Sequence, residues 1–246
     1  MTQAPNPGGR PPTLALEDIA TTGRAIGMAD LSLSAVATRL EVTPAALYRH
    51  VKNRWDLERL VGESMLEELV IDLEATADVS ATLHRLALDL HRFAIDRPGL
   101  ADYLLTLFPR GERGLTLMNE ATQKLREHGL SSEAAVIASN SVASLAFAMA
   151  AGQERRSRAL ERDADGGFAA EVLAATARFD ADDELGPAVT DLPSMTESEY
   201  ARMLLVVAVR GVVATIGQDP GAADATAIVT ELLVQARAAS TDPTRS

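Results

Sequence analysis

The chain has 246 residues, no cysteine, 47% hydrophobic and 24% charged residues, and a formal net charge of −12. This composition is typical of a globular protein and excludes disulfides, thiolate zinc sites and cysteine nucleophiles. Aromatic residues make up only 4% of the chain, so the core must be built from aliphatic side chains, which favours helices. Residues 1–62 carry a net charge of +1 and the other 184 residues a net −13. Only the N-terminal segment can therefore approach a polyanion without strong repulsion.

The N-terminal sequence does not resemble a targeting segment. Residues 1–12 are rich in proline and glycine and are predicted to be a disordered leader. They lack the basic-then-apolar order of a signal peptide, and no apolar run is expected to reach the roughly 18 to 20 residues of a membrane span. We therefore expect a cytoplasmic protein with no membrane partner.

Three short helices are expected next. The first ends at Gly27, and the second lies within "LSLSAVATRLEV", residues 31–42. The third starts at Pro44, because the Thr43 hydroxyl can cap it and a proline at the first helical position needs no N–H partner. It is expected to end near Lys52, since Asn53 is a good N-cap for a longer helix over residues 54–75.

The rest of the chain predicts further helices and no strand. They are expected over about residues 80–97, in a short segment that ends at 107, and over 112–128 and 132–158. A further short helix is expected over 168–179, within a mobile connection over 162–194. Thr196 and Glu199 form a capping-box pattern that opens an apolar helix to about Gly217, and Asp219-Pro220 opens a last helix to about Ala239. The fold class is therefore all-α, with a small N-terminal domain over 13–62, a larger domain over 63–240 and a short tail over 241–246.

The second and third helices, joined by a tight turn, form a helix-turn-helix pattern. A helix that enters the major groove needs short residues for close approach and donors for phosphates and base edges. The stretch "TPAALYRHVK", residues 43–52, supplies both. The alternative is that Tyr48 and His50 are half-buried packing residues and Lys52 is a solvated surface charge.

The run "LSLSAVATRLEVTPAALYRHVKNRWDL" resembles the DNA-binding domain of the tetracycline-repressor (TetR) family of transcriptional regulators. The resemblance is strongest from Leu14 to about Gly62 and continues in "REHGLSSEAAVIASNSVASLAFAMAAGQE", which is similar to the effector-binding domain of the tetracycline repressor itself. It implies a homodimer, a helical effector domain with a central cavity, and release from an operator when a small molecule binds. Many members have glycine where this chain has Glu41, and a non-glycine residue tolerates a positive φ less readily. We therefore expect this turn to be wound differently.

Carried onto matching positions, the resemblance assigns DNA contacts to the second and third helices. Base contacts are expected at the start of both helices, phosphate contacts follow, and Arg49 is a further donor. The residues are Ser34, Thr43, Pro44, Ala45, Ala46, Tyr48, Arg49, His50 and Lys52.

The resemblance also locates effector positions, and these are apolar here. The tetracycline repressor uses polar side chains and a magnesium-ligating histidine, whereas the matching residues are Val70, Leu86, Leu90, Leu104 and Leu107. A magnesium–tetracycline chelate is therefore not expected, and no cofactor is predicted. An apolar or aromatic effector fits better, with Asn119 or Asn140 as a polar anchor. The competing interpretation is that these leucines are simply core.

The late apolar helices, about Glu197–Gly217 and Gly221–Ala239, are expected at the dimer interface, with Val209 and Val213 on one candidate stripe. His84 and His91 lie seven apart on one predicted helix but lack the His-x-x-x-His spacing, so no metal site is expected. No Walker, GxSxG or GxGxxG motif occurs, and no enzymatic activity is predicted.

The predicted function is that of a ligand-responsive repressor, which binds a pseudo-palindromic operator as a homodimer and is released by a small, largely apolar effector. The alternatives are an enzyme or carrier for a hydrophobic ligand, with structural N-terminal helices, and an architectural DNA binder without an effector.

Overall fold

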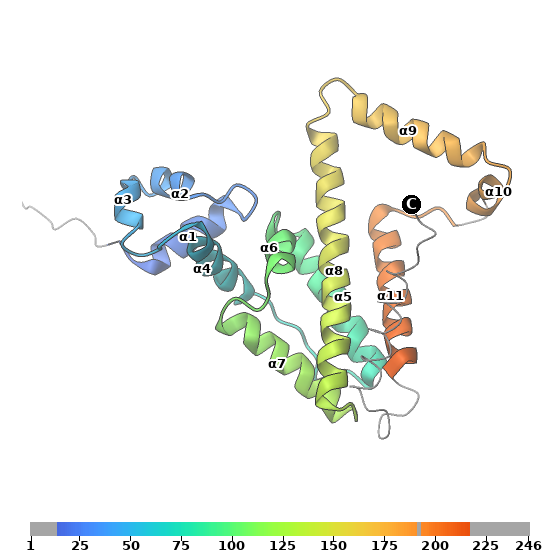
Figure 1. Cartoon of the computed structure of the whole chain (residues 1–246), viewed down its shortest axis with the longest axis horizontal. Helices are drawn as coiled ribbons and strands as arrows, with labels where there is room; N and C mark the ends of the chain where they lie inside the picture. Colours follow the sequence, from blue (N-terminus) through green and yellow to red (C-terminus); the bar gives the residue numbers. More distant parts are fainter. Residues whose placement is uncertain (1–13, 191–192, 217–246) are drawn as a thin grey trace, which may run out of the picture. The chain divides into compact units, whose positions relative to one another are not determined.

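The computed structural model describes residues 14–190 and 193–216, which form eleven helices and contain no strand (Figure 1). This confirms the predicted all-α fold class. The chain divides into two compact units, residues 1–68 and residues 69–246, where the sequence predicts a boundary after Gly62. The predicted leader, the predicted helix over 221–239 and the tail lie outside the described residues.

The first unit contains α1 (Leu16–Ile26), α2 (Leu33–Arg39), α3 (Pro44–Leu47) and α4 (Arg54–Leu66). Each helix contributes aliphatic side chains to one small core, and α1 packs against both α2 and α4. The fully buried members are Ile19, Val36, Leu47, Leu57 and Val61.

The packing of α1 against α4 depends on Gly23. A Cβ atom added at Gly23 would lie 2.3 Å from Cγ2 of Val61, which is closer than two carbon atoms can approach. Val61 is β-branched and fully buried, so its rotamer has little freedom to give way. The absence of a side chain at Gly23 therefore sets the close approach of these two helices.

The turn between α2 and α3 contains Glu41 with a φ of 55°. This is the left-handed conformation that glycine adopts readily and that other residues adopt at a cost of about 1–2 kcal/mol. The expectation that the turn would be wound differently without glycine is therefore wrong. The N–H of Val42 reaches the carbonyl of Ala37 at 3.0 Å, which closes the turn.

Two of the predicted helices are shorter than expected. The third ends at Leu47 rather than near Lys52, and residues 48–50 continue it only as a hydrogen-bonded turn. The fourth ends at Leu66 rather than at residue 75. Beyond it, Nη2 of Arg113 donates to the carbonyl oxygen of Leu69 at 2.9 Å, a role that a backbone N–H would fill in a continuing helix. Leu69 and Leu73 are buried in this non-helical segment.

The second unit is arranged around α8 (Ser132–Glu161), which packs against α5 (Val79–Ile95), α6 (Leu100–Thr106), α7 (Glu112–Glu127) and α11 (Glu197–Ile216) (Figure 1). The buried face of α8 consists largely of alanines, which allow the neighbouring helices to approach closely. Within the uncharged stretch of this helix lies a window long and apolar enough to cross a membrane, contrary to the expectation from the sequence. Half of that window is buried inside the protein, as in a core helix.

The connection predicted over residues 162–194 contains two helices, α9 (Gly167–Asp180) and α10 (Leu185–Thr190). The first matches the predicted short helix. The second was missed because Gly186 and Pro187 resemble a turn in the sequence. No residue of α9 is buried, and its large apolar side chains Val172, Leu173 and Phe179 are about half exposed or more.

The capping box at the start of α11 is confirmed. The hydroxyl of Thr196 accepts the N–H of Glu199 at 3.2 Å, and a carboxylate oxygen of Glu199 accepts the N–H of Thr196 at 2.7 Å. The N–H and the hydroxyl of Thr196 both donate to this carboxylate, and they hold the pKa of Glu199 below its ordinary value. Val209, assigned to a dimer stripe from the sequence, is completely buried within the chain, so that side chain belongs to the core.

Candidate functional site

The predicted DNA-contacting residues gather on α3 and the turn that follows it. Leu47 and Val51 point into the core of the first unit and are buried. Between and before them, the polar and short residues face outward, and Ser34 is exposed on α2. The exposed set is Thr43, Pro44, Ala45, Tyr48, Arg49 and Lys52, whereas Ala46 and His50 are partly exposed. Two buried aliphatic anchors therefore present the rest of the segment to solvent.

The two helices of the helix-turn-helix begin differently. The hydroxyl of Ser32 caps α2 by accepting the N–H of Ala35 at 3.1 Å. Thr43 occupies the N-cap position of α3, but its hydroxyl makes no capping bond. Instead its backbone carbonyl accepts the N–H of Ala46 at 2.9 Å, so the capping role expected for the hydroxyl is wrong. Pro44 stands at the first helical position, as predicted.

A hydrogen-bonded corner joins α3 to α4. Asn53 caps α4, with its side-chain oxygen accepting the N–H of Asp56 at 3.0 Å. In return, Oδ2 of Asp56 accepts the N–H of Lys52 at 3.1 Å, and Arg59 pairs with the other carboxylate oxygen. The Lys52 N–H and the Arg59 guanidinium hold the pKa of Asp56 below its ordinary value. The carboxylate is therefore ionised at neutral pH and fixes the position of the chain after α3.

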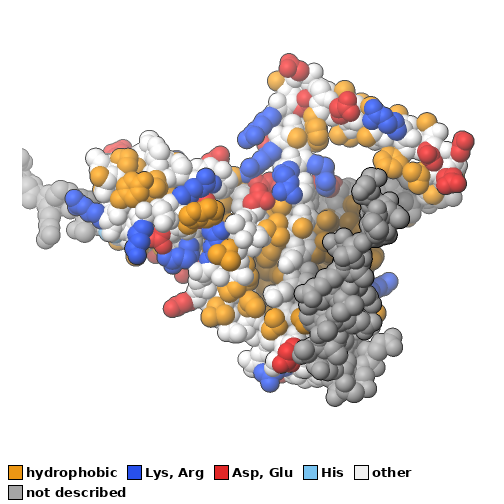
Figure 2. Space-filling model, in the orientation of Figure 1, with side chains coloured by type: hydrophobic (Ala, Val, Ile, Leu, Met, Phe, Trp, Pro, Cys, Tyr) orange, Lys and Arg blue, Asp and Glu red, His pale blue; other side chains and the backbone are white. Residues whose placement is uncertain are grey.

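The charges of this segment favour an anionic partner. Residues 42–55 contain Arg49, Lys52 and Arg54 and no carboxylate, and all three cationic residues are exposed. On the C-terminal side, the next acids, Asp56 and Glu58, have side chains that are only 23% and 13% exposed and are paired with arginines. On the N-terminal side, Glu41 is exposed. On the face shown in Figure 2, Lys and Arg side chains of α1–α4 lie among hydrophobic ones.

The predicted effector residues do not all lie in one environment. Leu86 and Leu90 on α5 and Leu104 on α6 are buried in the second unit, at 5%, 7% and 3% exposure. The other predicted residues are exposed: Val70, Leu107, Asn119 and Asn140. The structure thus brings three leucines of adjoining helices into the core and leaves the two candidate polar anchors at the surface.

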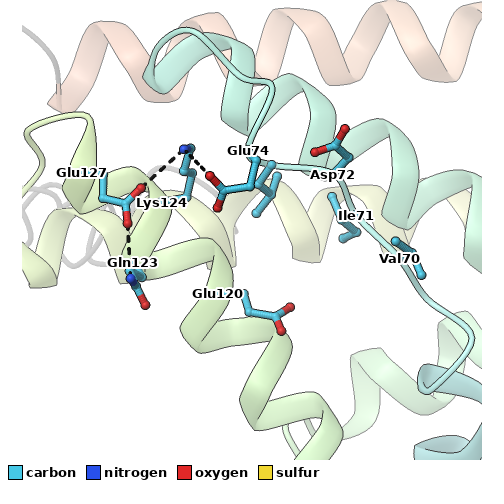
Figure 3. A pocket seen from close by; sticks show the side chains of 9 residues that line it. Val70, Ile71, Asp72, Glu74, Glu120, Gln123, Lys124 and Glu127 are labelled. Carbon is cyan, nitrogen blue, oxygen red and sulfur yellow. Dashed lines mark hydrogen bonds and ion pairs between the residues drawn. The ribbon is translucent and has the colours of Figure 1, made fainter.

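A surface groove of about 480 Å³ lies between the segment before α5 and the helix α7 (Figure 3). Of the predicted effector residues it contains only Val70. Lys124 reaches Glu74 across it at 3.3 Å and pairs with Glu127 on its own helix at 3.4 Å. Burial opposes the lysine's charge, but these two carboxylates outweigh it and raise the pKa of Lys124 above its ordinary value. Lys124 therefore ties α7 to the segment before α5, and its charge is already neutralised by protein carboxylates.

The two histidines considered as metal ligands have different surroundings. Nδ1 of His84 lies 2.8 Å from the carbonyl oxygen of Ser80 on its own helix. His91 is 6% exposed, and burial, assisted by the charge of Arg202, lowers its pKa. Among residues 14–190 and 193–216, no group of three or more His, Cys, Asp or Glu residues is placed to hold a metal ion.

Comparison with known proteins gives structural matches but no sequence matches. No family model matches the chain, and no curated protein matches it. Apo ActR from Streptomyces coelicolor superposes with a TM-score of 0.69 at 22% identity, covering 84% of this chain and 98% of ActR. ActR in complex with actinorhodin, described as a TetR family protein, gives 0.64 at 22% identity, covering 83% and 99%. A TetR variant from Acinetobacter baumannii in complex with minocycline gives 0.58 at 18% identity, covering 80% and 96%.

These matches extend over nearly the full length of the known chains and over both units of this one. The chain therefore has the all-α fold of the TetR-family regulators, with a helix-turn-helix unit followed by a larger helical unit. Because the identities are low, the comparisons concern the fold, and functional assignments rest on the residues of this chain.

Proposed function

We propose that the chain is a TetR-family transcriptional regulator that binds double-stranded DNA through α3 and the corner after it. The observation that carries this proposal is the arrangement of residues 43–52. Leu47 and Val51 are buried, while the short residues of α3 and two cationic side chains after it, Arg49 and Lys52, face solvent. Short residues allow a helix to lie deep in the major groove, Tyr48 can contact base edges, and Lys52 and Arg49 can contact phosphates. His50, Ser34, Thr43, Pro44, Ala45 and Ala46 complete the proposed contact set.

The proposed assembly is a homodimer formed through the second unit. Its described helices leave large apolar side chains exposed on α9 and on α11, where Tyr200, Met203 and Val207 are between 39% and 59% exposed. Exposed apolar surface of this kind is typical of protein interfaces, and obligate interfaces bury upwards of about 2,000 Å². A twofold dimer presents two copies of α3, so the operator should be a pseudo-palindrome. The setting proposed for this activity is the cytoplasm.

The proposed effector is a small, largely apolar or aromatic molecule that enters the second unit next to Leu86, Leu90 and Leu104. These side chains are aliphatic and buried, and no cofactor, metal ion or catalytic step is proposed. Because α4 ends at Leu66, a ligand bound in the second unit must act on the DNA-binding residues through the segment that follows this helix. A ligand shifts DNA affinity only as far as it prefers the arrangement that does not bind DNA, typically by about 1–3 kcal/mol.

The effector site is tested by Leu90→Trp. The larger side chain should fill the space that the effector needs, and the variant should bind operator DNA but fail to release it when inducer is added. Release measured by electrophoretic mobility shift distinguishes the two behaviours. A variant that releases DNA like the parent would place the effector elsewhere.

The experiment that tests the whole proposal is an electrophoretic mobility shift with the DNA upstream of the coding sequence, with and without extracts that contain small molecules. A regulator shifts this DNA at nanomolar protein concentration, the range typical of specific DNA binding, and releases it with ligand. A hydrophobic-ligand enzyme or carrier would bind ligand but no DNA. An architectural DNA binder would bind DNA regardless of ligand.

A further inference from the structure

Trp55 is a large apolar side chain at the surface of the first unit. It is 61% exposed, and it is the only tryptophan in the chain. Tryptophan is usually well buried or placed at interfaces, because its large ring gains most from leaving water. The core of the first unit is built without most of the Trp55 ring.

The backbone around Trp55 is held in place from both sides. Asn53 accepts the N–H of Asp56 at 3.0 Å, and Asp56 accepts the N–H of Lys52 at 3.1 Å. Trp55 thus lies in the first turn of α4, inside a closed hydrogen-bonded corner that directly follows α3. Its position is preorganised relative to the proposed DNA-reading helix, so a contact made there costs little backbone entropy.

The surroundings of Trp55 are cationic on the solvent side. The adjacent Arg54 side chain is 72% exposed, whereas the carboxylate of Glu58, with which it pairs at 2.7 Å, is 13% exposed. The acidic groups are thus turned inward while the guanidinium and the indole are turned outward. An approaching polyanion meets the positive and apolar groups first.

We propose that Trp55 contacts the DNA backbone next to the groove that α3 enters. Its exposed ring packs on a deoxyribose of the backbone, which gives the indole an apolar surface to cover. Because phosphates and sugars are the same at every base pair, this contact adds affinity without sequence preference. The inference rests on the proposed DNA binding of the first unit and extends it to α4.

Fluorescence provides a direct test, because all intrinsic tryptophan emission comes from Trp55. In the full-length parent, acrylamide should quench the emission strongly when the protein is free and less when upstream DNA is bound. As a control, a chain that carries Trp55→Phe and Leu160→Trp places the only tryptophan on α8, where Leu160 is 53% exposed. Upstream DNA should leave the quenching of this reporter unchanged.

Affinity measurements complete the test. Trp55→Ala should weaken binding about a hundred-fold, because a dimer loses two ring contacts that are each worth about ten-fold, and equally on operator and unrelated DNA. The variant's salt dependence should remain parental, because no charge is lost, and Trp55→Phe should fall between the parent and Trp55→Ala. Circular dichroism confirms that each variant is folded.

The inference fails if the parent binds DNA while Trp55 stays as accessible to acrylamide as in the free protein, or if folded Trp55→Ala binds DNA with parental affinity. Either result leaves the proposed function intact and assigns Trp55 to a contact with protein. If the parent binds no DNA at all, the proposed function itself fails, and with it this inference.

Discussion

At the scale of single residues, Gly23 has the most specific structural requirement in the first unit. A methyl group at this position would overlap the buried Val61 side chain. Gly23→Ala should therefore reduce the free energy of unfolding by about 1–3 kcal/mol, the usual cost of overpacking, although alanine is the better helix former. Urea unfolding followed by circular dichroism measures this change.

Gly211 is the matched control for Gly23. It lies in α11, and an added Cβ meets no other atom within 4 Å. Gly211→Ala should stabilise the protein by about 0.5–1 kcal/mol. If Gly23→Ala and Gly211→Ala changed the free energy of unfolding in the same direction, the close approach of α1 and α4 would not explain the effect of Gly23→Ala.

His91 should make stability depend on pH. Its folded-state pKa is lowered by burial and by the charge of Arg202, so the unfolded chain binds a proton more readily, at a pKa of about 6.5. The stabilising effect of the neutral folded histidine is fully present above about pH 6.5 and is lost as pH falls through this value towards the lower folded pKa. His91→Leu should therefore lose less stability than the parent between about pH 7.5 and 5.5, as measured by urea unfolding. An identical pH profile would contradict the assignment.

At the scale of helices, α11 has an inner and an outer face with different expected roles. Val209 is completely buried, whereas Val207 is 59% exposed. Val209→Asp would place an unpaired carboxylate in the core and should unfold the second unit. Val207→Asp should leave the chain folded and weaken the proposed dimer, as measured by light scattering over a dilution series. A Val207→Asp dimer as stable as the parental one would exclude the outer face of α11 from the interface.

The sequence predicts the order and type of the described helices well, because caps and breakers are local. Asn53, Pro44 and the Thr196–Glu199 box have their predicted positions. It predicts helix ends less well where distant groups decide them. Beyond the end of α4, the carbonyl of Leu69 is bound by Arg113, 44 residues away in the sequence, and periodicity contains no information about such a bond.

In the candidate site too, local features are predictable from the sequence and features set by distant contacts are not. The outward residues of α3 follow from helical spacing around Leu47 and Val51, so they are predictable. The role of Val209 in the core, and the separation of Leu107 and Asn140 from the buried leucines, depend on the packing of helices that are distant in sequence. Trp55 was overlooked because a tryptophan in an amphipathic helix normally predicts core.

At the scale of the whole molecule, the net charge differs between the N-terminal residues, which are proposed to bind DNA, and the rest of the chain. Residues 1–62 carry a net +1, but Glu63, Glu67 and Glu68 belong to the first unit and bring it to −2, which leaves −10 on the second unit. The larger unit therefore repels DNA more strongly, which favours an approach through the residues around α3 that are proposed to bind it. This arrangement makes salt dependence an informative property of the complex.

The most direct test of DNA recognition by α3 is a fluorescence anisotropy titration of labelled upstream DNA at several salt concentrations, with the parent, Lys52→Ala and Tyr48→Ala. The parent should bind as a dimer, and affinity should fall steeply with salt. Lys52→Ala should lower the log–log salt slope by about two, because a dimer loses two phosphate contacts of about 0.9 each. Tyr48→Ala should weaken operator binding with little change in slope. Parental affinity and slope in both folded variants, or no binding of upstream DNA by the parent, would contradict the account.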